Sequence, residues 1–261
     1  MLRLRAAAAS DAGTYRHVNQ DAAFAATWGA GVADGVGGGP AGDLASAALV
    51  HRLVAGNGDI RDALHLAVRV REANWDVGAH ARRDPALAGM ATTFTGLFVG
   101  EKSELIVAHT GDSRGYRLRD GVLTRETRDD SYVQELVDRG LLSAADAASH
   151  PRRNIITASL HGGETDTVTV TEHDAFVGDR WMLCSDGVSD YVPEADLAGT
   201  LARSETVAHA AHALVRLALE AGSRDNVTAV VCDVERGAPD RDRPEFAGSA
   251  AVRFREELES A

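Results

Sequence analysis

Four aspartates stand at the ends of strand-like runs in this sequence. Asp34 closes GVADG, Asp112 closes LIVAHTGDS, Asp186 closes WMLCSDG, and Asp225 opens DNVTAVV. Each alone has an ordinary explanation, because Asp-Gly and Gly-Asp pairs form turns and an aspartate there bonds its own backbone. Strand ends of one sandwich emerge along a shared edge, however, and carboxylates gathered there repel one another unless cations lie between them. Together the four predict a metal-binding edge.

The expected ligands of this edge are all hard oxygen donors. No thiolate or paired-histidine spacing stands nearby in the sequence. Such a set favours Mg²⁺ or Mn²⁺ over zinc or copper. Two ions about 3.5–4 Å apart could share a bridging carboxylate and activate a water between them. We therefore expect two core Mn²⁺ or Mg²⁺ ions.

Arg16 supplies a second component, in the segment SDAGTYRHVNQDA that ends just beyond Asp21. A guanidinium fork matches the geometry of a tetrahedral phosphate. The alternative is a surface salt bridge, which is the common role of an arginine before a turn. With an activated water on one side and this arginine on the other, the expected reaction is in-line hydrolysis of a phosphate monoester without a covalent intermediate.

The composition limits the classes of partner. The chain has 261 residues, 44% of them hydrophobic, and a formal net charge of −12. This length allows one large domain with a sizeable core. No basic surplus exists to neutralise nucleic acid or an anionic membrane, so neither is an expected partner. No apolar run reaches secretory or transmembrane length, and we expect a cytoplasmic protein.

Both cysteines lie in apolar runs, Cys184 in WMLC and Cys232 in AVVC. Neither has the arginine spacing of a cysteine-based phosphatase loop or a metal-binding CxxC. We expect two buried thiols that act as small hydrophobic residues.

Periodicity predicts alternating groups of helices and strands. The helical patterns cover residues 41–54, 59–80, 131–141 and 205–221, and in the second of these Ile60, Leu64 and Val68 share a face. The strand-like runs cover residues 29–33, 92–99, 104–109, 115–118, 167–171, 180–184 and 227–234. Grouped strands with long helices between the groups favour an α+β fold, a four-layer α/β/β/α sandwich of two antiparallel sheets flanked by helices.

The division of the chain is predicted near residue 236. Residues 1–236 form the expected catalytic domain, and residues 237–261 form a polar linker followed by a short helix. Phe246, Ala250, Phe254 and Leu258 of this tail follow the i, i+4 spacing of a helix docked on the surface.

Eight short blocks, in order, resemble the metal-dependent protein phosphatase family, type 2C, and in particular its bacterial serine/threonine members. The match covers nearly all of residues 6–235. The blocks are SDAGTYRHVNQDA, VADGVGG with AGDLAS, MATTFTGLFV, VAHTGDSRGYRL, LTRETRDDSYVQELVDRGLL, HPRRNIIT, LCSDGVSD and RDNVTAVV. Each block is short and rich in turn residues, but their shared order and spacing are specific.

The resemblance implies roles for individual residues. Asp34 would bridge the two metals, and the carbonyl of Gly35 would add a ligand. Asp186 and Asp225 would complete the second site. The remaining implied roles are water-mediated coordination by Asp21, a phosphate grip by Arg16, and a third, looser ion held by Asp112 with Asp186. Residues 131–157 would include or border a mobile flap, in which Arg152 and Arg153 would help to hold a phosphopeptide.

Several positions depart from the family pattern. Gln20 stands where an acidic residue is common, so one metal site would carry less charge. Val36 replaces a histidine that some members use as general acid, and valine cannot donate a proton. Ala91, and Ala158 with His161, alter the edges of two blocks. His109, just before Asp112, could approach the site or could be a hydrogen-bonded structural histidine.

The resemblance implies a phosphatase for phosphoserine and phosphothreonine in proteins, a monomer that opposes a cognate bacterial-type kinase. Two alternatives stay open. Gln20 and Val36 would also suit a phosphoprotein-binding scaffold that has lost catalysis. The same chemistry would also suit a regulator that dephosphorylates an anti-sigma antagonist, although no sensor domain is attached.

Overall fold

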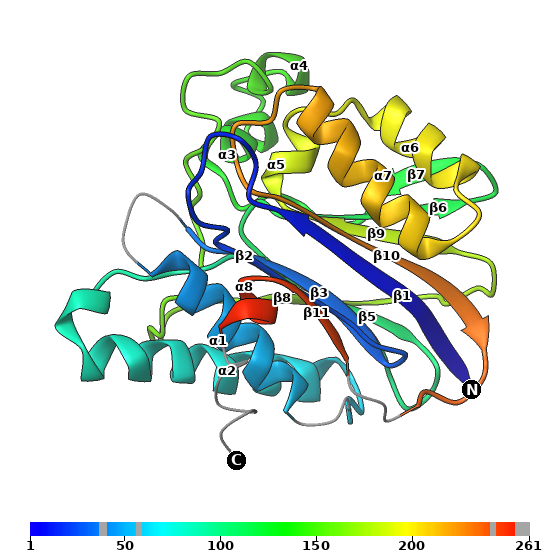
Figure 1. Ribbon diagram of the computed structural model, residues 1–261, viewed down its shortest axis with the longest axis horizontal. Coiled ribbons are helices and arrows are strands. Elements are labelled where there is room, and N and C mark those ends of the chain that lie inside the picture. Colours follow the sequence, from blue (N-terminus) through cyan, green and yellow to red (C-terminus); the bar gives the residue numbers. More distant parts are fainter. Residues whose placement is uncertain (37–40, 56–58, 241–243, 254–261) are drawn as a thin grey trace.

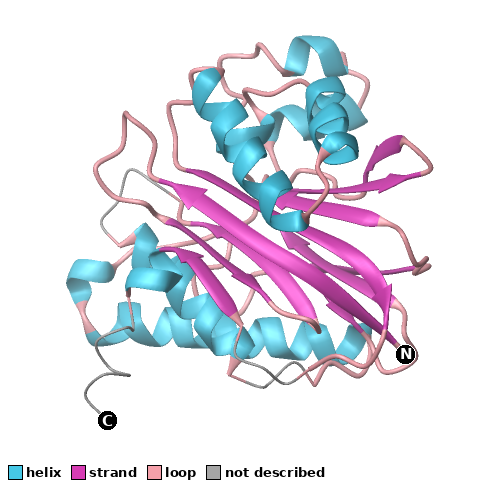
Figure 2. Ribbon diagram, turned by 45° about the vertical axis from the view of Figure 1, so that its right-hand side comes forward, coloured by secondary structure: helices cyan, strands magenta, loops and turns pink. Residues whose placement is uncertain are grey.

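Two antiparallel sheets lie face to face, and helices cover both outer surfaces (Figures 1 and 2). The computed structural model describes residues 1–36, 41–55, 59–240 and 244–253. One sheet has the strand order β1-β10-β9-β6-β7, and the other has the order β11-β2-β3-β4-β5-β8. This arrangement confirms the predicted α+β sandwich.

The strands of the first sheet are β1 (Leu2–Asp11), β6 (Arg114–Arg119), β7 (Val122–Arg125), β9 (Arg180–Cys184) and β10 (Val227–Arg236). Those of the second sheet are β2 (Asp21–Ala25), β3 (Gly29–Asp34), β4 (Phe94–Val99), β5 (Leu105–Thr110), β8 (Thr169–His173) and β11 (Glu245–Gly248). The α-helices are α1 (Gly42–Val54), α2 (Ala63–Arg83), α3 (Tyr132–Asp138), α4 (Ala144–Ala147), α5 (Asp186–Ser189), α6 (Glu194–Arg203), α7 (Val207–Glu220) and α8 (Ser249–Val252). A 3₁₀ turn covers Pro85–Leu87.

The central strands are buried on both faces, which explains their continuous apolar runs. In β10, Val230 and Cys232 point into the layer between the sheets, whereas Val231 packs under the helices α6 and α7. In β4, Leu97 faces the other sheet and Phe98 faces α1 and α2. Cys184 and Cys232 are buried free thiols, as predicted.

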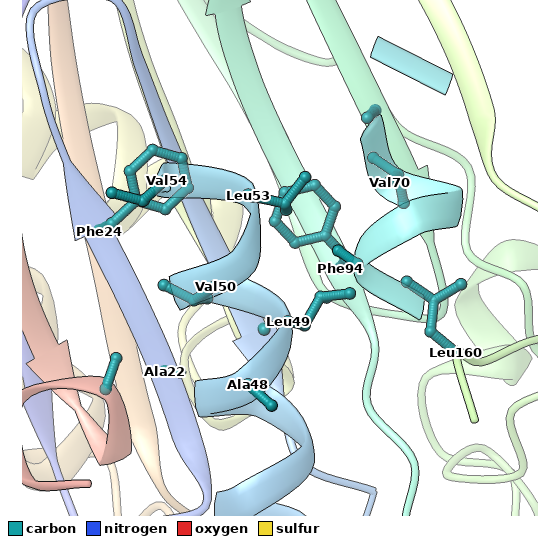
Figure 3. Close-up of a cluster of buried hydrophobic side chains, with 14 of the residues drawn as sticks. Ala22, Phe24, Ala48, Leu49, Val50, Leu53, Val54, Val70, Phe94 and Leu160 are labelled. Atoms are coloured by element: carbon teal, nitrogen blue, oxygen red, sulfur yellow. The ribbon is translucent and has the colours of Figure 1, made fainter. Parts of the chain in front are cut away.

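Helices α1 and α2 cover the second sheet through a separate apolar cluster. Figure 3 shows Leu49 and Leu53 of α1 close to Phe94 of β4, with Val70 of α2 on the far side. Burial of this many large side chains fixes α1 against β2 and β3, whose ends carry the candidate site. Within the described residues, no helix is both long and apolar enough to cross a membrane.

The structure corrects the expected face of α2. Leu64 and Val68 are 75% and 45% exposed, and Ile60 is buried but lies before the helix begins. The buried face is instead the one that carries Leu66, Val70, Ala73 and Val77. Two stripes of apolar residues share this helix, and the contacts with the sheet and α1 decide which one is covered.

The structure also corrects the expected tail helix. Residues 245–248 form β11, an edge strand that pairs with β2, and the helix that follows has only four residues, Ser249–Val252. Phe254 and Leu258 lie outside the described residues. The reason is that the open edge of β2 offers unpaired backbone groups, and pairing with them outweighs a weak helical pattern.

Candidate metal centre and active site

The antiparallel pairing brings strand ends to one edge. Asp21 begins β2 and Asp34 ends β3, and the two are directly opposed cross-strand partners. Asp186 follows β9 as the first residue of α5, and Asp225 precedes β10, the antiparallel neighbour of β9. Asp112 lies in the connection from β5 to β6, where the chain passes from one sheet to the other. Five aspartates from distant segments thus reach the same edge.

A pocket of about 340 Å³ opens at this edge. Its walls come from the β1–β2 loop, the ends of β3 and β9, the β5–β6 connection and the segment that contains Asn154 and Ile156. The lining residues are Arg16, Gln20, Asp34, Gly35, Val36, Thr93, Asp112, Asn154, Ile156, Asp186 and Asp225. Asp21 does not line it, because its side chain is fully buried beneath. The pocket therefore contains Arg16 and every predicted metal ligand except Asp21.

Backbone hydrogen bonds hold Asp34 in place without using its carboxylate. The Asp34 amide donates to Thr93 Oγ1 at 3.1 Å. Its carbonyl oxygen accepts from Thr92 Oγ1 at 2.9 Å and from the Thr93 amide at 2.8 Å. The residue also lines the pocket.

Gly35 lies where a side chain has no room. A Cβ at this position would collide with the carbonyl oxygens of Gly42 and Gln20. The absence of a side chain lets the start of α1 pack against the backbone that enters the pocket. This close packing gives a reason for glycine at the position whose carbonyl is the predicted ligand.

Burial and mutual repulsion perturb the carboxylates. The pKa of Asp34 is raised well above its usual value, first by burial and then by the charges of Asp21, Asp186, Asp112 and Asp225. Burial, followed by repulsion from Asp112, likewise raises the pKa of Asp186. The pKa of Asp21 is raised to about 6, chiefly by burial. Such groups favour a proton or a cation at neutral pH.

Among the five aspartates of this edge, Asp21 and Asp186 each have a buried carboxylate oxygen, Oδ1, that lacks a hydrogen-bond partner. Leaving buried acceptors unpaired is costly, and a hard cation would satisfy them. Within the described ranges, however, no three or more acidic, His or Cys side chains are already gathered closely enough to hold an ion. The donor set fits Mg²⁺ or Mn²⁺, since it consists of oxygen atoms.

Arg16 enters the pocket from the β1–β2 loop and pairs with Asp225. Its Nη2 donates to Asp225 Oδ2 at 2.7 Å. Both side chains are partly exposed, so the guanidinium is accessible from solvent. The predicted phosphate-binding arginine and a predicted metal ligand are therefore in direct contact.

Two supporting residues were not predicted from the sequence. Asn226 accepts from the Gln20 amide at 2.8 Å and donates to the carbonyls of Ala12 and Val18, so it fastens both ends of the loop that carries Arg16. Ser185 donates to Asp21 Oδ2 at 2.8 Å and accepts from the Thr228 amide. The sequence offered one signal for both residues: Ser185 directly precedes Asp186, and Asn226 directly follows Asp225.

Known proteins resemble this chain over most of its length, although no protein-family model matches it. The serine/threonine phosphatase stp of Listeria innocua is 35% identical over 225 residues, which are 81% of this chain and 86% of that protein. The serine/threonine protein phosphatase PstP of Mycobacterium tuberculosis is 42% identical over 96% of this chain, but this chain spans only 49% of PstP.

Solved structures agree with these relatives. The crystal structure of M. tuberculosis PstP has a TM-score of 0.84 and 41% identity, and the match covers 90% of this chain and all of that one. A structure of the PstP catalytic domain in complex with two manganese ions has a TM-score of 0.82 and 40% identity, with the same coverage. The chain belongs to the metal-dependent (PPM) serine/threonine protein phosphatase family.

Two positions of this chain that depart from the family pattern, Gln20 and Val36, both line the pocket. Gln20 lies beside Gly42 at the start of α1, and Val36 contributes an apolar wall next to Gly35. The Val36 amide donates to the carbonyl of Ala91. At this point the pocket wall contains no side chain that can transfer a proton.

His109 is buried and has partners on both ring nitrogens. Its Nδ1 lies 2.9 Å from Thr95 Oγ1, and its Nε2 lies 2.8 Å from the carbonyl oxygen of Arg128. Burial lowers its pKa. His109 does not line the pocket, and these contacts match the structural alternative.

The predicted flap region contains α3 and α4, and its two ends are in contact. Ser131 forms a bridge with Ile156, and Asn154 and Ile156 reach the pocket. Arg152 instead lies over the ring of Tyr132, and Arg153 pairs with Asp190 at 3.5 Å. Neither arginine lines the pocket.

Proposed function

We propose that this phosphatase removes phosphate from phosphoserine and phosphothreonine in proteins, at a centre of two Mn²⁺ or Mg²⁺ ions. One observation carries the proposal: a single pocket combines Arg16 with a set of oxygen donors, among which Asp186 has an unpartnered buried oxygen. The manganese complex of the M. tuberculosis PstP catalytic domain supports the choice of metal.

In this proposal Asp34 would hold both ions, the Gly35 carbonyl would add a further ligand, and Asp186 with Asp225 would complete the second site. Asp21, fully buried behind the pocket, would act through water, and Asp112 with Asp186 would hold a third ion. When bound, divalent ions supply the charge that lowers the pKa of water and offsets the charge of phosphate. The proposed ligands stand at or next to the ends of buried strands, and such fixed positions favour a preorganised site.

Arg16 is the proposed phosphate-binding group. Its fork can donate two parallel hydrogen bonds to phosphate oxygens, and in the structure its Nη2 donates to Asp225. Val36 cannot protonate the leaving alkoxide, so that proton has to come from solvent or from another pocket group.

The physiological setting is a further part of the proposal. Phosphorylated proteins are the substrates, a bacterial-type kinase opposes the enzyme, and Arg152 and Arg153 help to bind the protein around the phosphate. The free, buried thiols of Cys184 and Cys232 support a reducing compartment, the cytoplasm, as the place of action. We also propose that the enzyme works as a monomer, which light scattering of the purified protein tests.

The decisive experiment is hydrolysis of a phosphothreonine peptide by the purified chain with and without divalent ions. We expect turnover with added Mn²⁺ or Mg²⁺ and none after exhaustive chelation. Asp34→Ala should abolish turnover while the circular dichroism spectrum stays that of the folded protein. Turnover that survives chelation would refute the proposal.

The same experiment decides the alternative of a scaffold that only binds phosphoproteins. That alternative predicts binding of a phosphopeptide with negligible turnover at saturating Mn²⁺. Turnover of several per second would exclude it. The position of Gln20 in the pocket wall is its structural motivation, because an amide adds no charge to a metal site.

A further inference from the structure

The C-terminal segment, residues 244–253, packs behind the metal-binding edge. Its strand β11 and helix α8, red in Figure 1, lie beside β2 and α1. Strand β11 pairs with β2 so that Glu245 lies opposite Ala25 and Gly248 lies opposite Ala22. The register therefore brings Gly248 next to Asp21, the first residue of β2.

Gly248 contacts the backbone of Asp21 directly. A Cβ on Gly248 would collide with the carbonyl oxygen of Asp21, and the residue has a φ of +64°. Both conditions favour glycine, since other residues rarely adopt this conformation and would occupy the space. The C-terminal segment thus supports the backbone of a proposed metal-coordinating residue from the edge of β2 that faces away from β3.

Ser249 extends this support through a chain of buried hydroxyl groups. Its Oγ lies 3.0 Å from Ser46 Oγ, and Ser46 Oγ donates to the carbonyl oxygen of Gln20 at 2.5 Å. The Gly35 amide donates to the same carbonyl at 3.1 Å. Because Ser46 has one hydroxyl proton and gives it to Gln20, Ser249 is the donor in the first bond. This series of hydrogen bonds thus ends at the Gln20 carbonyl, which also holds the Gly35 amide.

Contacts with α1 keep the segment in place. Arg253 Nε donates to Asp43 Oδ2 at 2.8 Å, and Asp43 is largely buried. The ring of Phe246 stacks on His51 at a centroid distance of 4.4 Å, and His51 Nε2 lies 2.8 Å from the Ala250 carbonyl oxygen. Because the segment is held at several points, it can restrict the movement of the backbone at Gln20 and Asp21, which it contacts.

We propose that the C-terminal segment is a positioning element of the metal centre, in which Gly248 and Ser249 fix the backbone of Gln20, Asp21 and Gly35. It touches neither substrate nor reacting atoms. Its expected effect is to strengthen binding of the divalent ions, because preorganised ligands lose less freedom on binding. The inference depends on the proposed metal-binding function of the pocket.

The test compares Mn²⁺ affinity, measured by isothermal titration calorimetry on the full chain, among three variants. Ser249→Ala removes the donor to Ser46, and we expect a loss of about threefold to tenfold, the effect of one hydrogen bond. Gly248→Ala should weaken binding further, because the Asp21 carbonyl has to move. Glu245→Ala is the matched control, since Glu245 is exposed at the opposite end of β11.

Turnover distinguishes positioning from simple loss of fold. Ser249→Ala should turn over phosphopeptide slowly at limiting Mn²⁺ and as fast as the wild type at saturating Mn²⁺. Equal Mn²⁺ affinities of Ser249→Ala, Glu245→Ala and the wild type would overturn the inference while leaving the proposed function intact. A wild-type chain that binds no Mn²⁺ would overturn both. If Gly248→Ala does not fold, Ser249→Ala alone decides.

Discussion

Arg16 Nη2 lies 2.7 Å from Asp225 Oδ2, an ion pair between residues 209 positions apart. One partner is the proposed phosphate-binding group and the other a proposed metal ligand. If the Asp225 carboxylate were to hold a cation, the guanidinium would lose this acceptor and would be free to bind phosphate. Metal binding and substrate binding are therefore expected to be coupled through this pair.

Replacement of Arg16 should impair substrate binding more than metal binding. We expect Arg16→Ala to lower kcat/KM for a phosphothreonine peptide roughly tenfold to a hundredfold, since charge-assisted hydrogen bonds to phosphate are lost. Arg16→Lys should recover part of the loss, because it keeps the charge but not the fork. Steady-state kinetics at saturating Mn²⁺ measures both.

Arg224→Ala is the control for this series, because Arg224 lies over the ring of Tyr15 and outside the pocket lining. Its kcat/KM should stay close to that of the wild type. An equal decrease in Arg224→Ala and Arg16→Ala would show that general surface charge, and not a phosphate grip, is responsible.

Asp186→Asn should separate stability from activity. Burial and neighbouring carboxylates raise the pKa of Asp186, so its charge destabilises the metal-free fold at neutral pH. The amide removes this repulsion, and we expect the metal-free Tm at about pH 8 to rise by roughly 2–4 °C. Turnover should fall by about a thousandfold, since loss of a ligand weakens the metal centre.

The matched control is Asp59→Asn, the same chemical change at an exposed position. Neither its Tm nor its turnover should change. Differential scanning fluorimetry gives the Tm values, and a lower Tm for metal-free Asp186→Asn would contradict the proposed repulsion.

The stabilisation given by Mn²⁺ should increase with pH. Burial raises the pKa of Asp21 to about 6, and burial with repulsion from Asp129 raises that of Asp112 to about 7. Both values exceed the unfolded value of about 3.9, so the folded state binds more protons than the unfolded state. The free energy of unfolding of the metal-free protein should therefore fall as pH rises toward 7. Cations replace those protons, so the Mn²⁺-induced Tm shift should be larger at about pH 8 than at about pH 5. Equal shifts at both pH values would argue against a carboxylate site.

His109→Gln should affect folding and not the proton chemistry. Both ring nitrogens of His109 are engaged in the core, so the substitution should cost about 1–3 kcal/mol of unfolding free energy. The shape of the pH–rate profile should stay that of the wild type, because the imidazole does not line the pocket. Chemical denaturation and pH-dependent kinetics measure the two effects. A flattened limb of the profile in a fully folded variant would instead assign His109 to the reaction.

The sequence predicted the sandwich because its central strands carry an unusual amount of apolar character. Runs such as those around Val230 and Leu97 are buried on two faces, and only stacked layers provide that environment. The gathering of Asp34, Asp112, Asp186 and Asp225 around one pocket was predictable for a related reason. Antiparallel strands return to the same edge, so residues at strand ends meet even when they are distant in the chain.

Other features depend on tertiary contacts that local pattern does not encode. Strand β1 contains four consecutive alanines, which have low strand propensity, and pairing with all of β10 makes it a strand. Strand β11 forms because β2 has an open edge. Ser185 and Asn226 look like turn residues in the sequence, and their support of Asp21 and Gln20 needs partners far away in the chain.

The pocket is assembled from both halves of the sandwich. Asp21 and Asp34 belong to one sheet, whereas Asp186 and Asp225 adjoin strands of the other. Side chains such as Trp181 fill the layer between the sheets, and the thickness of this layer therefore sets the width of the pocket. A substitution that changes the side-chain volume in that layer would alter the distance between the carboxylates of the two sheets. Evolutionary constraints on the core of this protein are therefore also constraints on its candidate site.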